Sequence, residues 1–174
     1  MRKALVPHPA LRCDAVTGIE VEVRRSHFKL ALTYVVTGKI GDLRLAAITT
    51  PTRTDELWKH TCFEAFARAS QGNAYHEFNF APSTQWAAYR FCGYREGMTA
   101  ATEISAPRIK VTSNAECFEL RAALNLPVSV DASWHLALSA VIEETSGRKS
   151  YWALAHPPGK PDFHHPDGFA LELP

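Results

Sequence analysis

The chain lacks the charge excess and the long apolar runs that mark several large classes of protein. Its 174 residues include 19 Lys and Arg against 18 Asp and Glu, so the formal net charge is +1. Nucleic-acid-binding surfaces normally carry a clear excess of basic residues, and this balance argues against one. No apolar run approaches the roughly 18–20 residues that a bilayer span requires. We therefore expect neither nucleic acid nor a membrane among the partners.

A secretion signal is also missing from the N-terminal segment. Met1–Lys3 is basic, as the start of such a signal is, but Pro7 and Pro9 follow closely. They interrupt the segment where an apolar stretch of roughly 7–15 residues would have to lie. This absence predicts a cytoplasmic location.

Cysteine is sparse, and the motifs of several common enzymes are absent. The four cysteines are Cys13, Cys62, Cys92 and Cys117. They form no Cys-x-x-Cys pair, which disfavours a structural zinc site and, in a reducing compartment, a disulfide framework. The motifs G-x-G-x-x-G, G-x-x-x-x-G-K-S/T, H-E-x-x-H and G-x-S-x-G do not occur. Nucleotide binding through a P-loop and hydrolysis at a nucleophile elbow therefore lose support.

What the chain does contain is strand-like sequence. Ile19–Arg24 and Phe169–Leu173 alternate apolar and polar residues with a period of two, which is typical of half-buried strands. Further strand-like segments are Phe28–Thr37, Leu43–Leu45, Trp86–Phe91, Arg108–Thr112, Cys117–Leu124, His135–Glu143 and Ser150–Leu154. Turn residues such as Pro127 and Gly147 separate them. Together they predict an all-β protein, an antiparallel β-sandwich of roughly ten or more strands, in a single domain over residues 1–174.

The clearest local prediction is a hairpin formed by Thr61–Arg68 and Ala74–Phe80. Between these segments, Gly72 and Asn73 are residues that tolerate the positive φ of a tight loop. Side chains on a strand alternate between its two faces. One face of the hairpin should therefore carry Cys62, Glu64 and Phe66 from the first strand and Tyr75, Glu77 and Asn79 from the second.

Two glutamates in the middle of apolar strands indicate a polar groove on this face. A buried carboxylate is costly unless it is paired or reaches water, and this applies to both Glu64 and Glu77. The candidate aromatic walls and counter-charges are Trp58, Trp86, Arg90 and Arg95. Aromatic rings cover the apolar face of a sugar, while carboxylate and guanidinium groups bind its hydroxyls. A sugar-like ligand and a purely structural Glu–Arg ion pair both remain open at this point.

A histidine- and proline-rich segment near the C-terminus forms a second group of candidates. It contains His156, Asp162, His164, His165 and Asp167, interspersed with four prolines. These residue types bind metals, but their spacing matches no standard site, and we predict no metal. The segment would otherwise cap the ligand groove, with His156, His164 and His165 as ligand-binding residues, or serve only as a stiff structural loop.

The paired carboxyls also leave an enzymatic reading open. Glycosidases use two carboxyl groups as acid and nucleophile or as acid and base. An enzyme could combine Glu64 or Glu77 with His164 or His165, but nothing in the sequence marks either Glu as acid or base. We therefore predict no catalytic residue and keep the enzyme as an alternative.

Several of these segments resemble the DOMON-like family. The resemblance is carried by Trp58–Phe66, Tyr75–Ser83, Trp86–Arg95 and Tyr151–His165. It covers nearly the whole chain and is closest to small bacterial proteins of that superfamily. The family implies a β-sandwich that binds either haem or sugars, and its sugar-binding relatives are the family 9 carbohydrate-binding modules.

The resemblance also implies particular ligand residues. Family 9 modules clamp a terminal sugar between two tryptophans, and a strand glutamate shortly after the first of them holds the hydroxyls. Trp58 and Glu64 match that first tryptophan and that glutamate, and Trp152 is the candidate second tryptophan. Haem-binding relatives use a Met and a His as axial ligands; Met98 is the only internal Met, and no His matches the haem motif.

The sequence thus favours a non-catalytic β-sandwich that binds a sugar or a sugar-derived metabolite, without a cofactor. A haem-binding redox domain remains the alternative from a different class. We expect one concavity to be lined by Trp58, Glu64, Arg90 and Trp152, with His164 or His165 at its rim.

Overall fold

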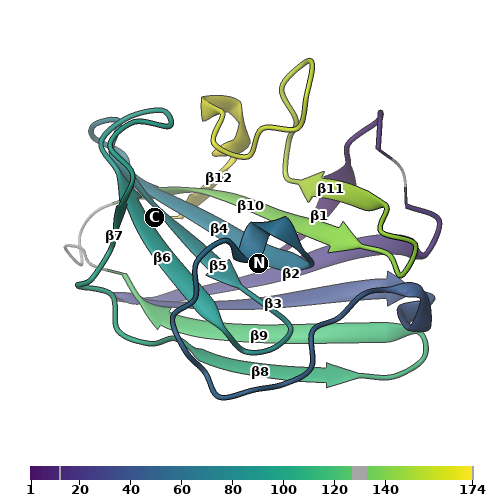
Figure 1. The fold of residues 1–174 in the computed structure, drawn as a ribbon. Helices are drawn as coiled ribbons and strands as arrows, with labels where there is room; N and C mark the ends of the chain where they lie inside the picture. Colours follow the sequence, from purple (N-terminus) through teal and green to yellow (C-terminus); the bar gives the residue numbers. More distant parts are fainter. Residues whose placement is uncertain (12, 127–132, 174) are drawn as a thin grey trace.

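The computed structural model describes residues 1–11, 13–126 and 133–173, and these form twelve strands in two curved antiparallel layers (Figure 1). Sheet A contains β2 (Val16–Ser26), β3 (Lys29–Gly38), β8 (Arg108–Ser113) and β9 (Cys117–Asn125). Sheet B contains β4 (Cys62–Ala69), β5 (Tyr75–Phe80), β6 (Trp86–Phe91), β7 (Thr99–Ala100), β10 (Trp134–Glu143), β11 (Lys149–Ala153) and β12 (Leu171–Leu173). The predicted antiparallel β-sandwich is therefore confirmed.

The first strand, β1 (Arg2–Pro7), belongs to both layers. Its residues Arg2–Leu5 pair with β2, and its last two residues, Val6 and Pro7, pair with Ala153 and Trp152 of β11. The strands consequently follow one continuous hydrogen-bonded order, β7-β6-β5-β4-β10-β11-β1-β2-β3-β9-β8, with β12 beside β10. Strand β1 was not predicted, because Leu5 is its only buried side chain and the segment shows no alternation of apolar and polar residues.

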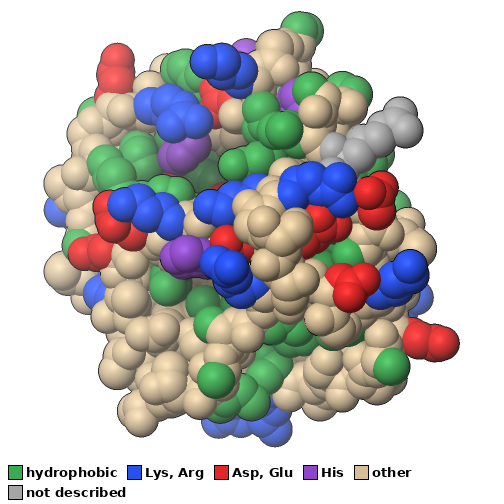
Figure 2. All heavy atoms as spheres, turned by 45° about the vertical axis from the view of Figure 1, so that its right-hand side comes forward, with side chains coloured by type: hydrophobic (Ala, Val, Ile, Leu, Met, Phe, Trp, Pro, Cys, Tyr) green, Lys and Arg blue, Asp and Glu red, His purple; other side chains and the backbone are tan. Residues whose placement is uncertain are grey.

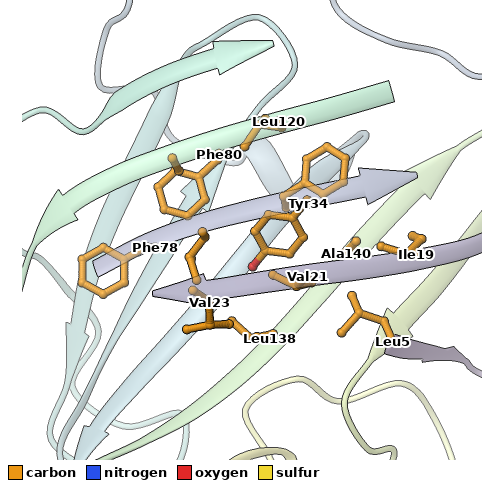
Figure 3. Close-up of a cluster of buried hydrophobic side chains, with 14 of the residues drawn as sticks. Leu5, Ile19, Val21, Val23, Tyr34, Phe78, Phe80, Leu120, Leu138 and Ala140 are labelled. Atoms are coloured by element: carbon orange, nitrogen blue, oxygen red, sulfur yellow. The ribbon is translucent and has the colours of Figure 1, made fainter. Parts of the chain in front are cut away.

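The core lies between the two sheets and is built from alternate residues of each strand. From Ile19 to Val23 on β2 and from Leu30 to Val36 on β3, every second side chain is buried. Figure 3 shows the two layers meeting in this cluster, with Leu5, Ile19, Val21, Val23, Tyr34 and Leu120 facing Phe78, Phe80, Leu138 and Ala140. Each large apolar side chain buried in this way contributes roughly 1.5–3 kcal/mol of transfer free energy.

The predicted hairpin is confirmed, whereas some element boundaries were wrong. Strands β4 and β5 pair antiparallel, with Phe63 opposite Phe80 and Phe66 opposite Glu77. The predicted strand Leu43–Leu45 is absent: a 3-10 turn, η1 (Ile40–Asp42), precedes it, and only Leu43 makes an isolated bridge to Glu144.

Other differences are small. Phe28 lies in the turn before β3, since His27 takes a left-handed conformation with φ of 54°. Phe169 precedes β12 instead of starting it. The predicted turn at Pro127 lies outside the described residues.

Within the described part of the chain, no helix has the length and apolar character needed to span a bilayer.

Candidate functional site

The site lies on the face of sheet B that points away from sheet A. On β4, Phe63, Ala65 and Ala67 belong to the core between the sheets, whereas Phe66 packs into a second cluster on the outer side. This outer side is covered by the loop after β6, by the long loop that follows β11 and by the 3-10 turn η2 (Leu57–Lys59) (Figure 1). Strand β4 is therefore buried on both faces over its first six residues.

A cavity of about 370 Å³ opens between this face and its covering segments. Its apolar wall comprises Trp58, Phe91, Met98, Val141, Tyr151, Pro161 and Phe163. Its polar groups are Glu64, Glu77, Arg95 and His164. Figure 2 shows hydrophobic side chains gathered in a recess that is bordered by His and basic side chains. A mostly apolar cavity with a few converging polar groups is the usual form of a small-molecule site.

Glu64 is a buried carboxyl without a hydrogen-bond partner for one of its oxygens. Glu64 is 3% exposed, and its Oε1 has no hydrogen-bond partner among the described residues. Ser139 lies opposite Glu64 on β10, and its hydroxyl likewise has no hydrogen-bond partner among the described residues. The Ser139 hydroxyl lowers the pKa of Glu64, but by less than burial raises it. Burial first, and the neighbouring Glu77 second, raise the pKa of Glu64 well above its usual value. The backbone here is fixed, because Tyr34 Oη donates to the Glu64 carbonyl at 2.7 Å.

Glu77 is the second buried carboxyl of the cavity. It is 4% exposed, and Asn79 Nδ2 donates to its Oε1 at 2.7 Å. Burial raises the pKa of Glu77 to about 7, although the Asn79 hydrogen bond and the Arg95 charge oppose this rise. Its other oxygen, Oε2, lies 3.7 Å from His164 Nε2.

His164 is held in one orientation by Tyr75. The Tyr75 hydroxyl lies 2.7 Å from His164 Nδ1 and accepts a hydrogen bond from the Arg95 backbone N–H at 3.2 Å. The hydroxyl proton is thus free to go to Nδ1, which assigns the ring proton to Nε2, facing Glu77. Burial, followed by the Arg95 charge, lowers the pKa of His164 to about 4, so the ring is neutral near pH 7.

Arg95 lies at the rim and does not neutralise either glutamate. Its Nη2 binds Asp162 Oδ1 at 2.7 Å, and the Tyr94 hydroxyl donates to the other oxygen of the same carboxylate. No Arg forms an ion pair with Glu64 or Glu77 in the part of the chain that the structure describes. Arg95 also has a left-handed backbone with φ of 56°, a conformation uncommon for this residue type, and its N–H bond to Tyr75 holds it there.

Trp58 supplies the largest aromatic surface of the wall. It lies on η2 and is half-buried. Its ring meets Tyr89 edge to face at 5.7 Å, and the Tyr89 hydroxyl donates to Asp55 at 2.8 Å. The structure thus brings together five of the ten residues predicted for the site: Trp58, Glu64, Glu77, Arg95 and His164.

The two other predicted tryptophans lie in the core between the sheets and do not line the cavity. Trp152 is 5% exposed and donates from Nε1 to Ser150 Oγ at 3.0 Å. Alternation along β11 turns Trp152 inward and Tyr151 outward, so Tyr151 takes the position predicted for the tryptophan. Trp86 is likewise 5% exposed, with the Arg53 guanidinium 4.2 Å from its ring centre.

Three polar residues predicted for the site are also directed elsewhere. Arg90 points to the solvent at the sheet edge formed by β7. It is exposed, and its Nε donates to Thr99 Oγ1 at 2.9 Å. His156 binds the Val6 carbonyl at 2.9 Å and so ties its loop to β1. His165 accepts a hydrogen bond from the Asp167 N–H and caps the 3-10 turn η3 (Pro166–Gly168). The predicted concavity is therefore wrong for Arg90 and Trp152.

The cavity also contains residues that sequence analysis missed. Phe91, Tyr151 and Phe163 form much of its wall, together with Met98, which the sequence offered only as a haem ligand. Tyr75, predicted on this face of the hairpin, orients His164. Tyr151 could have been predicted, because neighbouring side chains on a strand point to opposite faces and only one of Tyr151 and Trp152 can face the cavity. Among the described residues, no three His, Cys, Asp or Glu side chains come together as metal ligands.

Comparisons with known proteins agree with this architecture at the level of the fold. No family model matches the chain, and no curated protein matches it significantly. A crystal structure of a candidate carbohydrate-binding protein from Bacteroides uniformis superposes with a TM-score of 0.71 at 13% identity, covering 96% of this chain and 83% of that one.

Two further similar structures are family 9 carbohydrate-binding modules from Caldicellulosiruptor kristjanssonii. The module in complex with glucose has a TM-score of 0.52 at 11% identity, over 82% of this chain and 69% of that one. The module in complex with cellotriose has a TM-score of 0.53 at 10% identity, over 90% of this chain and 74% of that one. The chain therefore has a fold related to that of family 9 modules.

Proposed function

We propose that this protein is a non-catalytic binding module that takes a sugar or a sugar-derived metabolite into the cavity on sheet B. One observation carries the proposal: Glu64 is almost fully buried, its Oε1 has no hydrogen-bond partner among the described residues, and it lines a cavity with aromatic walls. A buried carboxyl oxygen without a hydrogen-bond partner destabilises the folded protein, and a ligand that donates a hydrogen bond to it removes this cost. The fold relationship to modules solved with glucose and cellotriose supports a sugar as that ligand.

The roles divide between the aromatic and the polar side chains. Trp58, Tyr151 and Phe163 would contact the apolar face of a pyranose ring, while Glu64 and Glu77 would bind its hydroxyls. The volume of about 370 Å³ lies at the lower end of the range for ligand sites, roughly 300–1,000 Å³. It therefore favours a monosaccharide or a short oligosaccharide over a long polysaccharide segment.

The finer family assignment is part of the same proposal. We place the chain in the DOMON-like superfamily, as one domain over residues 1–174, on the strength of its Trp58–Phe66 and Tyr75–Ser83 segments. The pairing of these segments beside the cavity is consistent with that placement.

Titration of the purified protein with glucose, cellotriose and a panel of nucleotide sugars tests the proposal. Binding should change the tryptophan fluorescence, because Trp58 lines the cavity, and should give a heat in calorimetry. Glu64→Gln should weaken binding, whereas Glu22→Gln, on the outer face of sheet A, should not. If no sugar gives either signal, the proposal is wrong.

A second candidate, a glycoside-cleaving enzyme, is favoured by one observation. Glu77 has a pKa raised to about 7 and lies beside the neutral His164, so it holds a proton that can be transferred near neutral pH. Turnover of a chromogenic glycoside that disappears in Glu77→Gln would support this candidate. Binding without turnover supports the module.

A further inference from the structure

The cavity contains two carboxyl groups, and no cationic side chain of the described residues is in contact with either. Glu64 lies opposite Asn79, and Glu77 lies opposite Phe66, so the two glutamates occupy diagonal positions on one face of the β4–β5 pair. Diagonal neighbours in a sheet are separated by roughly 7–8 Å at the backbone, close enough for one small group to reach both side chains. The neighbouring Glu77 raises the electrostatic cost of ionising Glu64.

The charged and titratable groups around Glu64 and Glu77 do not form ion pairs with them. The titratable groups that interact with this pair are Tyr34 from β3, Cys62 from β4, Tyr75 from β5, Tyr89 from β6, Arg95 from the loop after β6 and His164 from the loop after β11. Arg95 is bound to Asp162, and His164 is neutral near pH 7. Among the described residues the pair therefore has hydrogen-bonding and aromatic neighbours but no counter-ion in contact.

The walls around the pair are suited to a positive charge. Trp58, Phe91, Tyr151 and Phe163 line the cavity beside the glutamates. The faces of aromatic rings attract cations, and this attraction increases where water is excluded. A carboxyl pair with an unpartnered oxygen, enclosed by aromatic rings, is complementary to an ammonium group.

We propose that the ligand of this cavity is an amino sugar, a hexosamine whose protonated amine lies between Glu64 and Glu77 while its ring packs on the aromatic wall. This inference rests on the proposed function and narrows its ligand class. The amine would give Glu64 Oε1 the hydrogen-bond donor that it lacks. Because an ammonium favours the ionised form of both carboxyls, its binding should release protons to the solvent.

Calorimetry with matched sugars tests the inference. Glucosamine, galactosamine and mannosamine are each compared at pH 7 with the parent hexose and with the N-acetylated form, which has no charge. At least one hexosamine should bind about tenfold tighter than both of its neutral counterparts, as a charge-assisted hydrogen bond predicts. The heat of its binding should depend on the ionisation enthalpy of the buffer, since protons are released.

Variants separate the outcomes. Glu64→Gln and Glu77→Gln keep the shape of the site and should each remove the preference for the amine, while Glu22→Gln should retain it. Thermal melting shows whether each variant is folded. If neutral sugars bind as tightly as the hexosamines, the inference is overturned and the proposed function stands. If no sugar of either kind binds, both are overturned.

Discussion

Strand glutamates lie on both outer faces of the sandwich, and their surroundings differ sharply. On sheet A, Glu20 and Glu22 reach the solvent, and their partners Arg2 and Arg24 lie within 3.5 and 2.7 Å. On sheet B, Glu64 and Glu77 are 3% and 4% exposed and form no ion pair with an arginine of the described chain. The same residue type in the same kind of strand is solvated on one face and sequestered on the other.

The difference arises from the loops and not from the strands. The segments that follow β6 and β11 cover sheet B and contribute Arg95, Phe163 and His164 to the cavity. Covering a sheet face normally favours apolar residues there, because desolvated carboxyls are costly. The two glutamates under this cover are therefore the basis of the proposed binding role, whereas those of sheet A are solvated and need no such explanation.

The largest expected effect comes from removing the aromatic centre of the covered face. Phe66 is fully buried, and its ring lies 5.0 Å from that of His164 and 6.4 Å from that of Phe169. Phe66→Ala should lower the free energy of unfolding by about 3–5 kcal/mol, as for other buried aromatics. Val35→Ala, on the outer face of sheet A, should cost less than about 1 kcal/mol. Urea denaturation compares them, and similar losses would show that sheet B is not truly covered.

The next effect is a loss of stability with rising pH, which the raised pKa of a covered glutamate produces. Since the pKa of Glu77 is raised from 4.5 to about 7, the native state binds its proton more tightly than the unfolded state does. Its contribution to the free energy of unfolding is therefore lost as pH rises from about 4.5 to about 7, by at most about 3 kcal/mol. In Glu77→Gln this loss of stability with rising pH should be absent.

His164 acts in the opposite direction and must be separated from this effect. Its pKa is lowered to about 4, so its protonation destabilises the fold as pH falls from 6.5 towards 4. This contribution is present in both proteins, and the difference between wild type and Glu77→Gln isolates the glutamate. Urea denaturation at pH 5 and pH 8 gives that difference. Glu22→Gln, whose carboxyl has a lowered pKa, should not reproduce it.

A smaller effect distinguishes the wall of the cavity from the core. Trp58→Ala should weaken sugar binding by about 1–3 kcal/mol, which is typical of a lost aromatic anchor. It should change the free energy of unfolding by less than about 1 kcal/mol, because the ring is only half-buried. Trp152→Ala should show the reverse pattern, with loss of stability as its main effect. A Trp58→Ala protein that unfolds would make Trp58 a core residue.

The smallest effect is expected on the solvated face. Arg24 has a side chain that is 75% exposed, and its ion pair with Glu22 is screened by water. Arg24→Ala should leave both sugar affinity and the midpoint of urea denaturation within experimental error. A measurable loss of affinity would mean that sheet A takes part in binding.

The sequence predicted the strands best where one face is dry and the other is wet. Ile19–Arg24 alternates because β2 has the core on one side and solvent on the other. Strand β1 shows no such pattern, since only Leu5 is buried, and its place depends on pairing with two distant strands. Pairing partners of that kind are not encoded in local periodicity.

For the site, residues on strands were easier to place than residues on loops. Glu64 and Glu77 followed from alternation on the β4–β5 hairpin, and both line the cavity. In the loop after β11, neighbouring histidines diverge: His164 enters the cavity while His165 caps η3. A loop without a repeat gives no rule for the direction of its side chains. Trp152 shows a different error, because aromatic residues serve equally well in a core and in a binding wall.

Strand β1 has a mechanical consequence for the molecule. Because Arg2–Leu5 pairs with sheet A and Val6 with sheet B, the two sheets are joined by hydrogen bonds through one strand. Sliding one over the other would shear the pairing of a single continuous strand, so the sandwich should resist such motion along this seam. The opposite margins, at β7 and β8, have no shared strand in the described chain. Any motion that changes the separation of the two sheets should therefore be a hinge motion about β1, with the largest displacements at β7 and β8.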